Sequence, residues 1–195
     1  MGSRTLSTYT GFVKPVGDRI CAVLALIALS PLLAVLAWRI HREDGGPVFF
    51  RQTRPGKDDV PFELVKFRSM PVGVQQVPSA EAGELPVTRI GKLLRRWSLD
   101  EIPQLLNIAR GDMSFVGPRP PMPSQHTLLS LRRASGALHL RPGLTGWAQV
   151  NGTDGMPEDE KAVWDGEYVH RISFLGDLAI IARTIRFLAN PPPRV

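Results

Sequence analysis

The sequence predicts an α/β fold that is mostly helical, with a small β-hairpin, in a monotopic membrane protein. Three observations support this prediction: a long apolar run near the N-terminus, two strand-like runs joined by a turn, and amphipathic runs rich in Arg and Lys. We expect a re-entrant kinked helix and interfacial amphipathic helices. The 195 residues then divide into an N-terminal segment (1–13), the re-entrant helix (14–42), a cytoplasmic domain at the membrane surface (43–190) and a tail (191–195).

The apolar run extends from Ile20 to Trp38 and contains no charged residue. As a straight helix it would measure about 28 Å, close to the roughly 30 Å hydrocarbon core of a bilayer. Pro31 leaves the carbonyl of Ile27 without its helical partner, and Ser30 can bond back to the preceding turn, so a kink is expected at Ser30-Pro31. Basic residues flank both ends, which favours a cytoplasmic position for both. We therefore prefer a re-entrant helix; a kinked single span and a buried helix of a soluble protein are the alternatives.

Two strand-like runs, 48–53 and 62–70, are joined by a turn-rich segment and predict the hairpin. In the second run, side-chain alternation places Lys66 and Arg68 on one face, about 7 Å apart. Two cations at that spacing can bracket a phosphate. An exposed sheet face is the simpler interpretation of the alternation alone.

A loop is expected over 71–87, because this stretch is rich in Pro, Gly, Gln and Val and has no period. Thr88 then caps a short basic helix. Its apolar residues recur at the helical spacing: Ile90, Leu93, Leu94 and Trp97. This pattern is typical of a helix in the membrane interface, and equally of a helix that packs on a core and solvates its basic face.

Two adjacent carboxylates, Asp100 and Glu101, follow this helix. Ser98 and Glu101 have the spacing of a capping box, which would place the carboxylates in the first turn of the next helix. Pro103 is better tolerated at the first helical position than at the fifth, so that helix can instead begin near Pro103. The carboxylates would then be presented from the turn before it. The sequence leaves both interpretations open, and Gly111 is expected to end the helix.

Two stretches rich in Pro and Gly, 111–121 and 141–152, are expected to be rigid loops. Prolines on both sides of Arg119 restrict its backbone, which lowers the entropy lost when the guanidinium binds a phosphate. The last predicted helix, 173–189, is amphipathic, and it fits either a core position or the membrane interface.

The net charge of +6 implies anionic partners, which include nucleic acid, an anionic membrane and phosphorylated substrates. The low aromatic content of 7% and the long apolar run disfavour a nucleic-acid binder. A single cysteine, Cys21, excludes an intrachain disulfide. Zinc-site spacing and the usual nucleotide and hydrolase motifs are absent.

Several motifs occur in an order that resembles the small bacterial sugar transferases, the monotopic phosphoglycosyl transferases of the minimal kind. They are the apolar run with Ser30-Pro31, FFRQTRPG, KFRSM, TRIGKLLRRWSLDEIPQLLNIARGDMSFVGPRP and RPGLTGWAQVNG. The resemblance covers about residues 14 to 188. It implies transfer of a phospho-sugar from a UDP-sugar to polyprenol (undecaprenyl) phosphate with release of UMP, the first membrane step of bacterial glycan assembly.

The resemblance also implies roles for individual residues. Asp100 is expected to be the nucleophile that forms a covalent aspartyl phospho-sugar, and Asp100 and Glu101 are expected to lie at a Mg²⁺ ion. The expected phosphate-binding residues are Arg119, Lys66, Arg95 and Arg68. Further candidates for the substrate site are Arg54, Gln104, Arg141, Gln149 and Asn151.

The expected location is the cytoplasmic face of the bacterial inner membrane. The expected partners are the UDP-sugar, the polyprenol phosphate, membrane lipids and a second copy of the chain in a homodimer, with no nucleic acid. After QVNG many relatives carry a basic residue where this chain has Thr153-Asp154, so no sugar identity is transferred. A catalytically inactive membrane-anchored scaffold for glycan-assembly enzymes is the alternative function.

Overall fold

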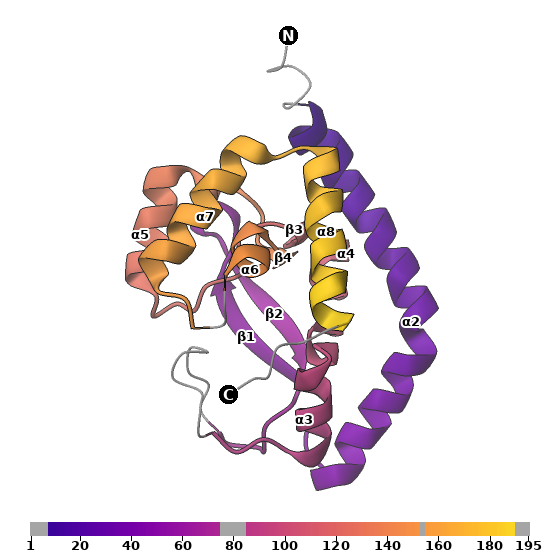
Figure 1. Cartoon of the computed structure of the whole chain (residues 1–195). Helices are drawn as coiled ribbons and strands as arrows, with labels where there is room; N and C mark the ends of the chain where they lie inside the picture. Colours follow the sequence, from indigo (N-terminus) through magenta and orange to yellow (C-terminus); the bar gives the residue numbers. More distant parts are fainter. Residues whose placement is uncertain (1–7, 75–84, 153–154, 190–195) are drawn as a thin grey trace.

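The computed structural model describes residues 8–74, 85–152 and 155–189. A long helix, α2 (Lys14–Asp44), runs along one side of a body of shorter helices and two small sheets, and both of its ends return to that body (Figure 1). A short π-helix, η1 (Tyr9–Val13), leads into α2. The mostly helical α/β prediction is confirmed. The tail 191–195, part of the expected loop 71–87, and Thr153-Asp154 lie outside the described residues.

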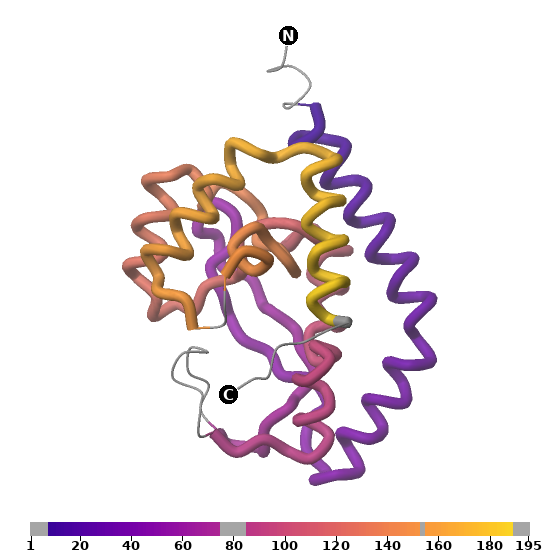
Figure 2. Tube along the Cα trace, viewed as in Figure 1, coloured from indigo at the N-terminus to yellow at the C-terminus, as the bar shows by residue number. Residues whose placement is uncertain are grey.

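The helix α2 bends but does not break at its proline. The Ser30 hydroxyl donates to the Ile27 carbonyl over 2.8 Å, and so satisfies the acceptor that Pro31 cannot reach. The helix continues through Pro31 as one element, and its trace changes direction about half-way along, in agreement with the expected kink (Figure 2). It ends at Asp44, two residues beyond the predicted boundary, where Gly45 takes a left-handed φ of 69°.

One stripe of α2 packs on the body and the opposite stripe is exposed. The packed residues belong to two apolar clusters, one with Ala22, Leu64, Leu105, Ile108 and Met113, and one with Leu36, Ile40, Phe67, Ile90 and Leu94. The exposed stripe includes Ile20, Val23, Leu24, Ile27, Leu32, Val35 and Trp38. By length and composition, the helix from Tyr9 to Asp44 could cross a membrane, and it is the one helix of the described chain that could.

Both ends of α2 are bonded to the body. Near the N-terminal end, the Lys14 ammonium lies 2.6 Å from the Asp177 carboxylate. At the C-terminal end, the Glu43 carboxylate accepts from the backbone N–H groups of Arg89 and Ile90 at 2.6 and 2.8 Å, so it caps the start of the next helix. The body therefore holds α2 at two points on either side of its bend.

The predicted hairpin is confirmed and lies in the centre of the body (Figure 1). Strand β1 (Phe49–Pro55) pairs antiparallel with β2 (Pro61–Phe67), and a 3-10 turn, η2 (Lys57–Asp59), joins them. Strand β2 ends at Phe67, so Lys66 lies in the sheet and Arg68 lies beyond it.

The next helix, α3 (Arg89–Arg96), is capped as predicted, because the Thr88 hydroxyl accepts from the Gly91 N–H at 2.9 Å. Its apolar residues do not form one buried stripe. Ile90 and Leu94 are buried in the core, whereas Leu93 and Trp97 are 47% and 44% exposed. The helix therefore combines the two positions that its sequence allows: it packs on the core and exposes apolar surface among basic side chains.

The two stretches expected to be rigid loops contain regular structure. Strand β3 (Ser114–Val116) in the first pairs parallel with β4 (Gly143–Thr145) in the second, and a short helix, α6 (Trp147–Asn151), follows β4. The expectation of irregular loops was therefore wrong for these parts. The pairing fixes the chain just before Arg119, because Gly117 donates to the Thr145 carbonyl at 2.9 Å.

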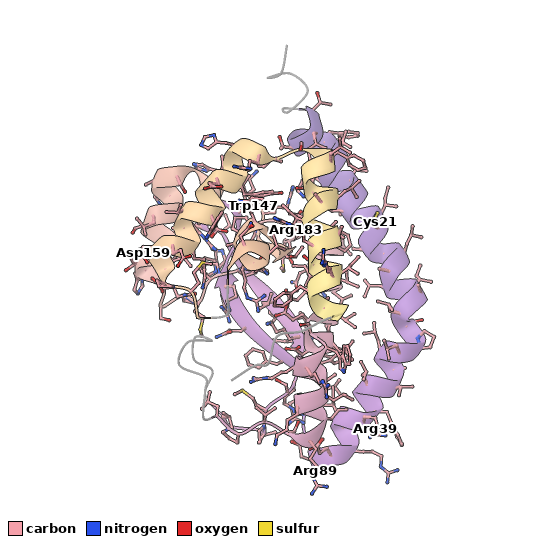
Figure 3. All side chains as sticks on the ribbon, viewed as in Figure 1. Cys21, Arg39, Arg89, Trp147, Asp159 and Arg183 are labelled. Carbon is pink, nitrogen blue, oxygen red and sulfur yellow. The ribbon has the colours of Figure 1, made fainter. Side chains whose placement is uncertain are left out.

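Three helices and a 3-10 turn complete the body: α5 (His126–Ser135), η5 (Ala137–His139), α7 (Glu158–Arg171) and α8 (Phe174–Ala189). Helices α5 and α7 lie side by side on the face away from α2 (Figure 1). Helix α8 matches the predicted amphipathic segment and exposes Phe174, Leu175, Leu178, Ile185 and Phe187. Figure 3 shows Trp147 and Arg183 close together where α6 meets α8; the guanidinium lies 5.4 Å from the ring centre.

Candidate active site

The two adjacent carboxylates lie in a 3-10 turn, η4 (Leu99–Gln104), directly before helix α4 (Leu105–Arg110). Ser98 has a left-handed φ of 52° and its side chain caps nothing, so the capping box does not form. The α-helix begins after Pro103 and ends at Gly111, whose φ is 91°. The second interpretation of the sequence is therefore the correct one, since the carboxylates are presented from the turn that leads into the helix.

Glu101 is clamped by two cations. Its Oε1 accepts from the Lys66 ammonium at 2.8 Å and from Arg119 Nη2 at 2.6 Å, and its Oε2 accepts from Arg119 Nη1 at 3.3 Å. Burial alone would raise the pKa of Glu101, but the charges of Arg119 and Lys66 and their hydrogen bonds outweigh it and hold the pKa well below its usual value. Glu101 is therefore a charged anchor that fixes both cations.

Asp100 has a different environment. Its carboxylate accepts no hydrogen bond from the described residues, and it lies on the wall of an open cavity of about 270 Å³. Burial, and then the neighbouring charge of Glu101, raise the pKa of Asp100 despite the opposing influence of Lys66, Arg119 and Arg95. The two neighbours thus differ: Glu101 is held in an ion-pair cluster, and Asp100 is left available to a ligand.

Two more arginines surround the pair. Arg54 donates to Gln52 Oε1 at 2.9 and 2.6 Å, and burial followed by the charge of Arg119 lowers its pKa to about 10. Arg95 donates from Nε to the Ser69 hydroxyl at 3.0 Å. With Lys66 and Arg119 these make four cations around two carboxylates, a formal excess of two positive charges. Such an arrangement favours a multiply charged anion such as a diphosphate.

The structure does not bring Arg68 into this cluster. Its guanidinium forms an ion pair with Asp44 at the end of α2 and also donates to the carbonyls of Pro47 and Met70, at 2.6 and 3.2 Å. The side chain is only 8% exposed. Arg68 therefore fastens α2 to the hairpin, although it also lines the cavity that Lys66 and Asp100 line, and its expected role as a phosphate ligand stays a prediction.

The other candidates predicted from sequence have mainly structural contacts. Arg141 donates to the Gly111 carbonyl at 2.8 Å, and Asn151 donates to the Trp147 carbonyl at 2.8 Å. Gln149 donates to the Leu144 carbonyl at 3.2 Å. Gln104 Nε2 and Gln149 Oε1 are buried without a hydrogen-bond partner in the described chain. Of this group only Arg54 lies in the cluster, so the structure assigns the other four no place at Asp100.

Arg119 is supported by a buried ion pair that was not predicted from the sequence. Arg132 Nη1 donates to the Arg119 carbonyl at 2.9 Å, and its Nε donates to the Asp165 carboxylate at 2.8 Å. Both side chains are almost fully buried, at 3% and 2% exposed. Lys161 lies one turn before Asp165 on α7, and burial, then the charges of Arg132 and Arg119, lower its pKa. Only the spacing of Lys161 and Asp165 could have indicated a shared face.

Known proteins resemble this chain over most of its length. The family model described as "Bacterial sugar transferase" matches residues 9–190. A UDP-glucose:undecaprenyl-phosphate glucose-1-phosphate transferase of Caulobacter vibrioides is 40% identical over 181 residues, which cover 88% of this chain and 68% of the relative. The enzyme of the same name from Escherichia coli is 39% identical over 92% of this chain and 41% of its own length.

A third relative has a different sugar in its name. The UDP-N-acetylgalactosamine-undecaprenyl-phosphate N-acetylgalactosaminephosphotransferase of Aeromonas hydrophila is 37% identical over 95% of this chain and 46% of its own length. The chain thus spans less than half of the longer relatives and about two thirds of the Caulobacter protein. Since the family model matches nearly the whole chain, and the Caulobacter relative is matched over most of its length, this protein belongs to the bacterial sugar transferase family.

Proposed function

We propose that this protein transfers a phospho-sugar from a UDP-sugar to polyprenol (undecaprenyl) phosphate and releases UMP. The observation that carries the proposal is the Asp100 carboxylate, which faces a cavity without a hydrogen bond from the described residues, next to a Glu101 clamped by Lys66 and Arg119. The names of the relatives support the donor and acceptor classes. Two different sugars appear in those names, so the proposal names none.

The reaction proceeds by two displacements at one phosphorus. An Asp100 carboxylate oxygen attacks the sugar-linked phosphorus of the UDP-sugar, the phosphorus–oxygen bond to UMP breaks, and UMP leaves with the bonding electron pair. A phosphate oxygen of polyprenol phosphate then attacks the same phosphorus, which breaks its bond to Asp100 and restores the carboxylate. Covalent catalysis divides one difficult transfer into two easier steps. The excess of cations offsets the repulsion between the carboxylate and the diphosphate.

Asp100 and Glu101 could hold Mg²⁺ only together with other ligands, such as substrate phosphates and waters. Among the described residues, no group of three or more His, Cys, Asp and Glu side chains could hold a metal by itself. Mg²⁺ in phosphoryl-transfer sites is commonly held by one or two carboxylates with substrate phosphates and waters. Asp100 suits the first position, and Glu101 retains lone pairs beside its bonds to Lys66 and Arg119. When bound there, Mg²⁺ would neutralise charge on the diphosphate.

We further propose that α2 dips into one leaflet of the bacterial inner membrane from the cytoplasmic face. Its exposed stripe is apolar, and the exposed apolar residues of α8 and of Leu93 and Trp97 add to the same character. An ion pair and a capping carboxylate hold both ends of α2 on one body. A single crossing would instead place the two ends on opposite sides of the membrane. The reaction itself favours this position, because a water-soluble donor must meet a lipid acceptor.

Cysteine labelling tests the topology. Thr8→Cys and Arg42→Cys, each made with Cys21→Ser, should both react with an impermeant maleimide in inverted membrane vesicles and stay unlabelled in spheroplasts. Lys57→Cys, in the exposed turn of the hairpin, serves as the cytoplasmic reference. Labelling of positions 8 and 42 from opposite sides would establish a true span.

The function itself is tested by incubating the purified protein with polyprenol phosphate, Mg²⁺ and single UDP-sugars, including UDP-glucose and UDP-N-acetylgalactosamine, and measuring UMP. At least one sugar of the panel should give UMP and a polyprenol diphosphate sugar, and EDTA should suppress both. A protein that is folded in membranes but releases no UMP from any donor would instead support the scaffold.

The buried Arg132–Asp165 pair should position Arg119. Asp165→Asn alone should cost about 3–5 kcal/mol of unfolding free energy, because it leaves Arg132 charged and unpaired. The double variant Arg132→Met/Asp165→Leu should recover most of that stability, yet UMP release should remain about 10- to 100-fold low, because the Arg119 carbonyl has lost its donor. Urea unfolding and UMP release measure the two effects.

An exposed ion pair beside it provides the matched control. Arg133 and Asp59 lie 2.7 Å apart with side chains 59% and 43% exposed. Arg133→Met/Asp59→Asn, which keeps a residue that tolerates the left-handed φ of 64° at position 59, should leave UMP release unchanged and alter stability by less than about 1 kcal/mol. Full activity in Arg132→Met/Asp165→Leu would show that the buried pair has no part in positioning.

A further inference from the structure

The cavity beside Asp100 is lined by both charged and apolar side chains. Its charged and polar lining residues are Arg51, Lys66, Arg68, Ser69, Arg95 and Asp100. The apolar lining residues are Pro47, Phe49, Phe50, Phe67, Met70, Pro71, Val72 and Val74. Arg68 also lines the cavity, but its donors serve Asp44, Pro47 and Met70. The cavity therefore brings cations together with a set of apolar side chains.

This division matches a phosphate ester of an apolar alcohol better than a nucleotide. A uracil base carries donors and acceptors that lose hydrogen bonds in apolar surroundings, at a cost of about 1–3 kcal/mol for each unsatisfied group. Isoprene units have none and gain from burial. The parallel rings of Phe49 and Phe67, 5.5 Å apart, provide such an apolar wall, and Phe49 is 41% exposed at it.

This apolar wall also adjoins the C-terminal part of α2. Phe67 is 2% exposed and packs in the apolar cluster with Leu36 and Ile40 of α2, and Pro47 follows the end of that helix by three residues. A chain of isoprene units in the cavity would therefore lie next to the helix that we place in the membrane. Arg119 and Arg54 do not line this cavity. A second anion, the donor diphosphate, can therefore bind near them.

We propose that this cavity is the acceptor subsite, where Lys66 and Arg95 bind the phosphate of polyprenol phosphate and the apolar wall holds its first isoprene units. The proposal rests on the proposed function and adds the place of the acceptor. The acceptor phosphate then lies beside Asp100, so its oxygen can attack the aspartyl-bound phosphorus once UMP has left. Arg119 and Arg54 serve the donor diphosphate.

Formation of the adduct uses only the donor, and transfer from the adduct uses only the acceptor. Measuring the two steps separately in variants that fill the cavity therefore tests which ligand binds there. Val72 is 64% exposed on the cavity wall, so Val72→Trp fills space without disturbing the core. Val60 is 63% exposed at the turn of the hairpin and does not line the cavity, so Val60→Trp is the matched control. Phe49→Ala removes part of the apolar wall. It provides a second variant whose folding does not require the protein to accommodate the large side chain introduced by Val72→Trp.

Formation of the phospho-sugar adduct on Asp100 without acceptor is followed by mass spectrometry, and transfer to a short-chain polyprenol phosphate by UMP release under steady-state conditions. Val72→Trp and Phe49→Ala should raise the KM for the acceptor about tenfold, equivalent to about 1.4 kcal/mol. Both should form the adduct at the wild-type rate, and Val60→Trp should match the wild type in both assays. Thermal unfolding confirms that each variant is folded.

Slower adduct formation in Val72→Trp, with transfer from the completed adduct unchanged, would assign the cavity to the donor and overturn the proposal. Unchanged kinetics in both half-reactions for both variants would overturn it as well. A wild-type protein that forms no adduct and no UMP indicates something different, because it contradicts the proposed function and not the position of the acceptor.

Discussion

Asp100→Asn should lower UMP release by at least about 10⁴-fold, because it removes the nucleophilic oxygen on which covalent catalysis depends. The same substitution should raise the melting temperature of the metal-free protein. The Asp100 carboxylate is partly buried, accepts no hydrogen bond from the described residues, and lies next to the charged Glu101. A neutral amide of the same shape relieves both the burial of charge and the repulsion.

Two assays check this prediction: UMP release with Mg²⁺, and thermal unfolding in EDTA. Asp159→Asn is the matched control, since Asp159 is exposed on the outer side of α7 (Figure 3) and should show neither effect. Activity in Asp100→Asn close to wild type would remove the proposed nucleophile. A lower melting temperature would show that the surrounding cations already stabilise the carboxylate more than burial destabilises it.

Local patterns predicted the parts of the fold that depend on neighbouring residues. The Thr88 cap, the Gly111 stop, the hairpin and the amphipathic segment at 173–189 all appear as expected. Ser30 bonds back to Ile27 as its position beside Pro31 indicated. Each of these signals acts within a few residues of chain, where backbone sterics and local hydrogen bonds decide the conformation.

Features that depend on distant partners were not accessible from the sequence. The parallel pairing of β3 with β4 joins two stretches about thirty residues apart, each of which by itself has the composition of a loop. Alternation placed Lys66 and Arg68 on one face but could not show that Glu101 pairs with the first and Asp44 with the second. The ion pair between Arg132 and Asp165, which supports Arg119, likewise joins two helices, α5 and α7, that were not predicted from the periodicity of the sequence.

The turn at Ser98 shows why the carboxylates were ambiguous. The capping box and the turn before Pro103 use the same residues, and local rules permit both. The left-handed φ of Ser98 decides between them, and it brings Glu101 to Lys66 of β2 and to Arg119 after β3. These contacts cross the molecule, so tertiary ion pairs fix the local conformation here.

Glu101→Gln should have the opposite effect on stability from Asp100→Asn. Lys66 and Arg119 would lose their shared counter-charge while Arg54 remains close to Arg119. The side chains of Glu101, Lys66 and Arg119 are 15%, 20% and 39% exposed, so the cost should be below the roughly 3–5 kcal/mol typical of a fully buried pair. Because the guanidinium of Arg119 would also lose its anchor, UMP release should fall about 10²-fold or more. Urea unfolding in EDTA and UMP release measure these effects.

The pH dependence identifies the charge of Glu101 as the source of this stability. A carboxylate whose folded pKa is depressed stabilises the protein fully above its unfolded pKa of about 4.3 and loses this contribution as the pH falls toward the folded value. The stability difference between wild type and Glu101→Gln should therefore be largest near neutral pH and shrink in acid. Glu63→Gln is the control, because Glu63 pairs with Arg51 at 2.7 Å but is 49% exposed, and its loss should cost less than about 1 kcal/mol.

If the two adjacent carboxylates have different roles, Asp100→Asn and Glu101→Gln should change the stability in opposite directions. If Glu101 is the anchor, its charge is stabilising and its removal unfolds the site; if Asp100 is kept for chemistry, its charge destabilises the free protein and is satisfied only when substrate and metal arrive. A loss of stability in both variants would mean that the two carboxylates share the structural role. A gain in both would mean that the cations around Glu101 do not depend on it, and the cluster would then be held by the loops that carry them.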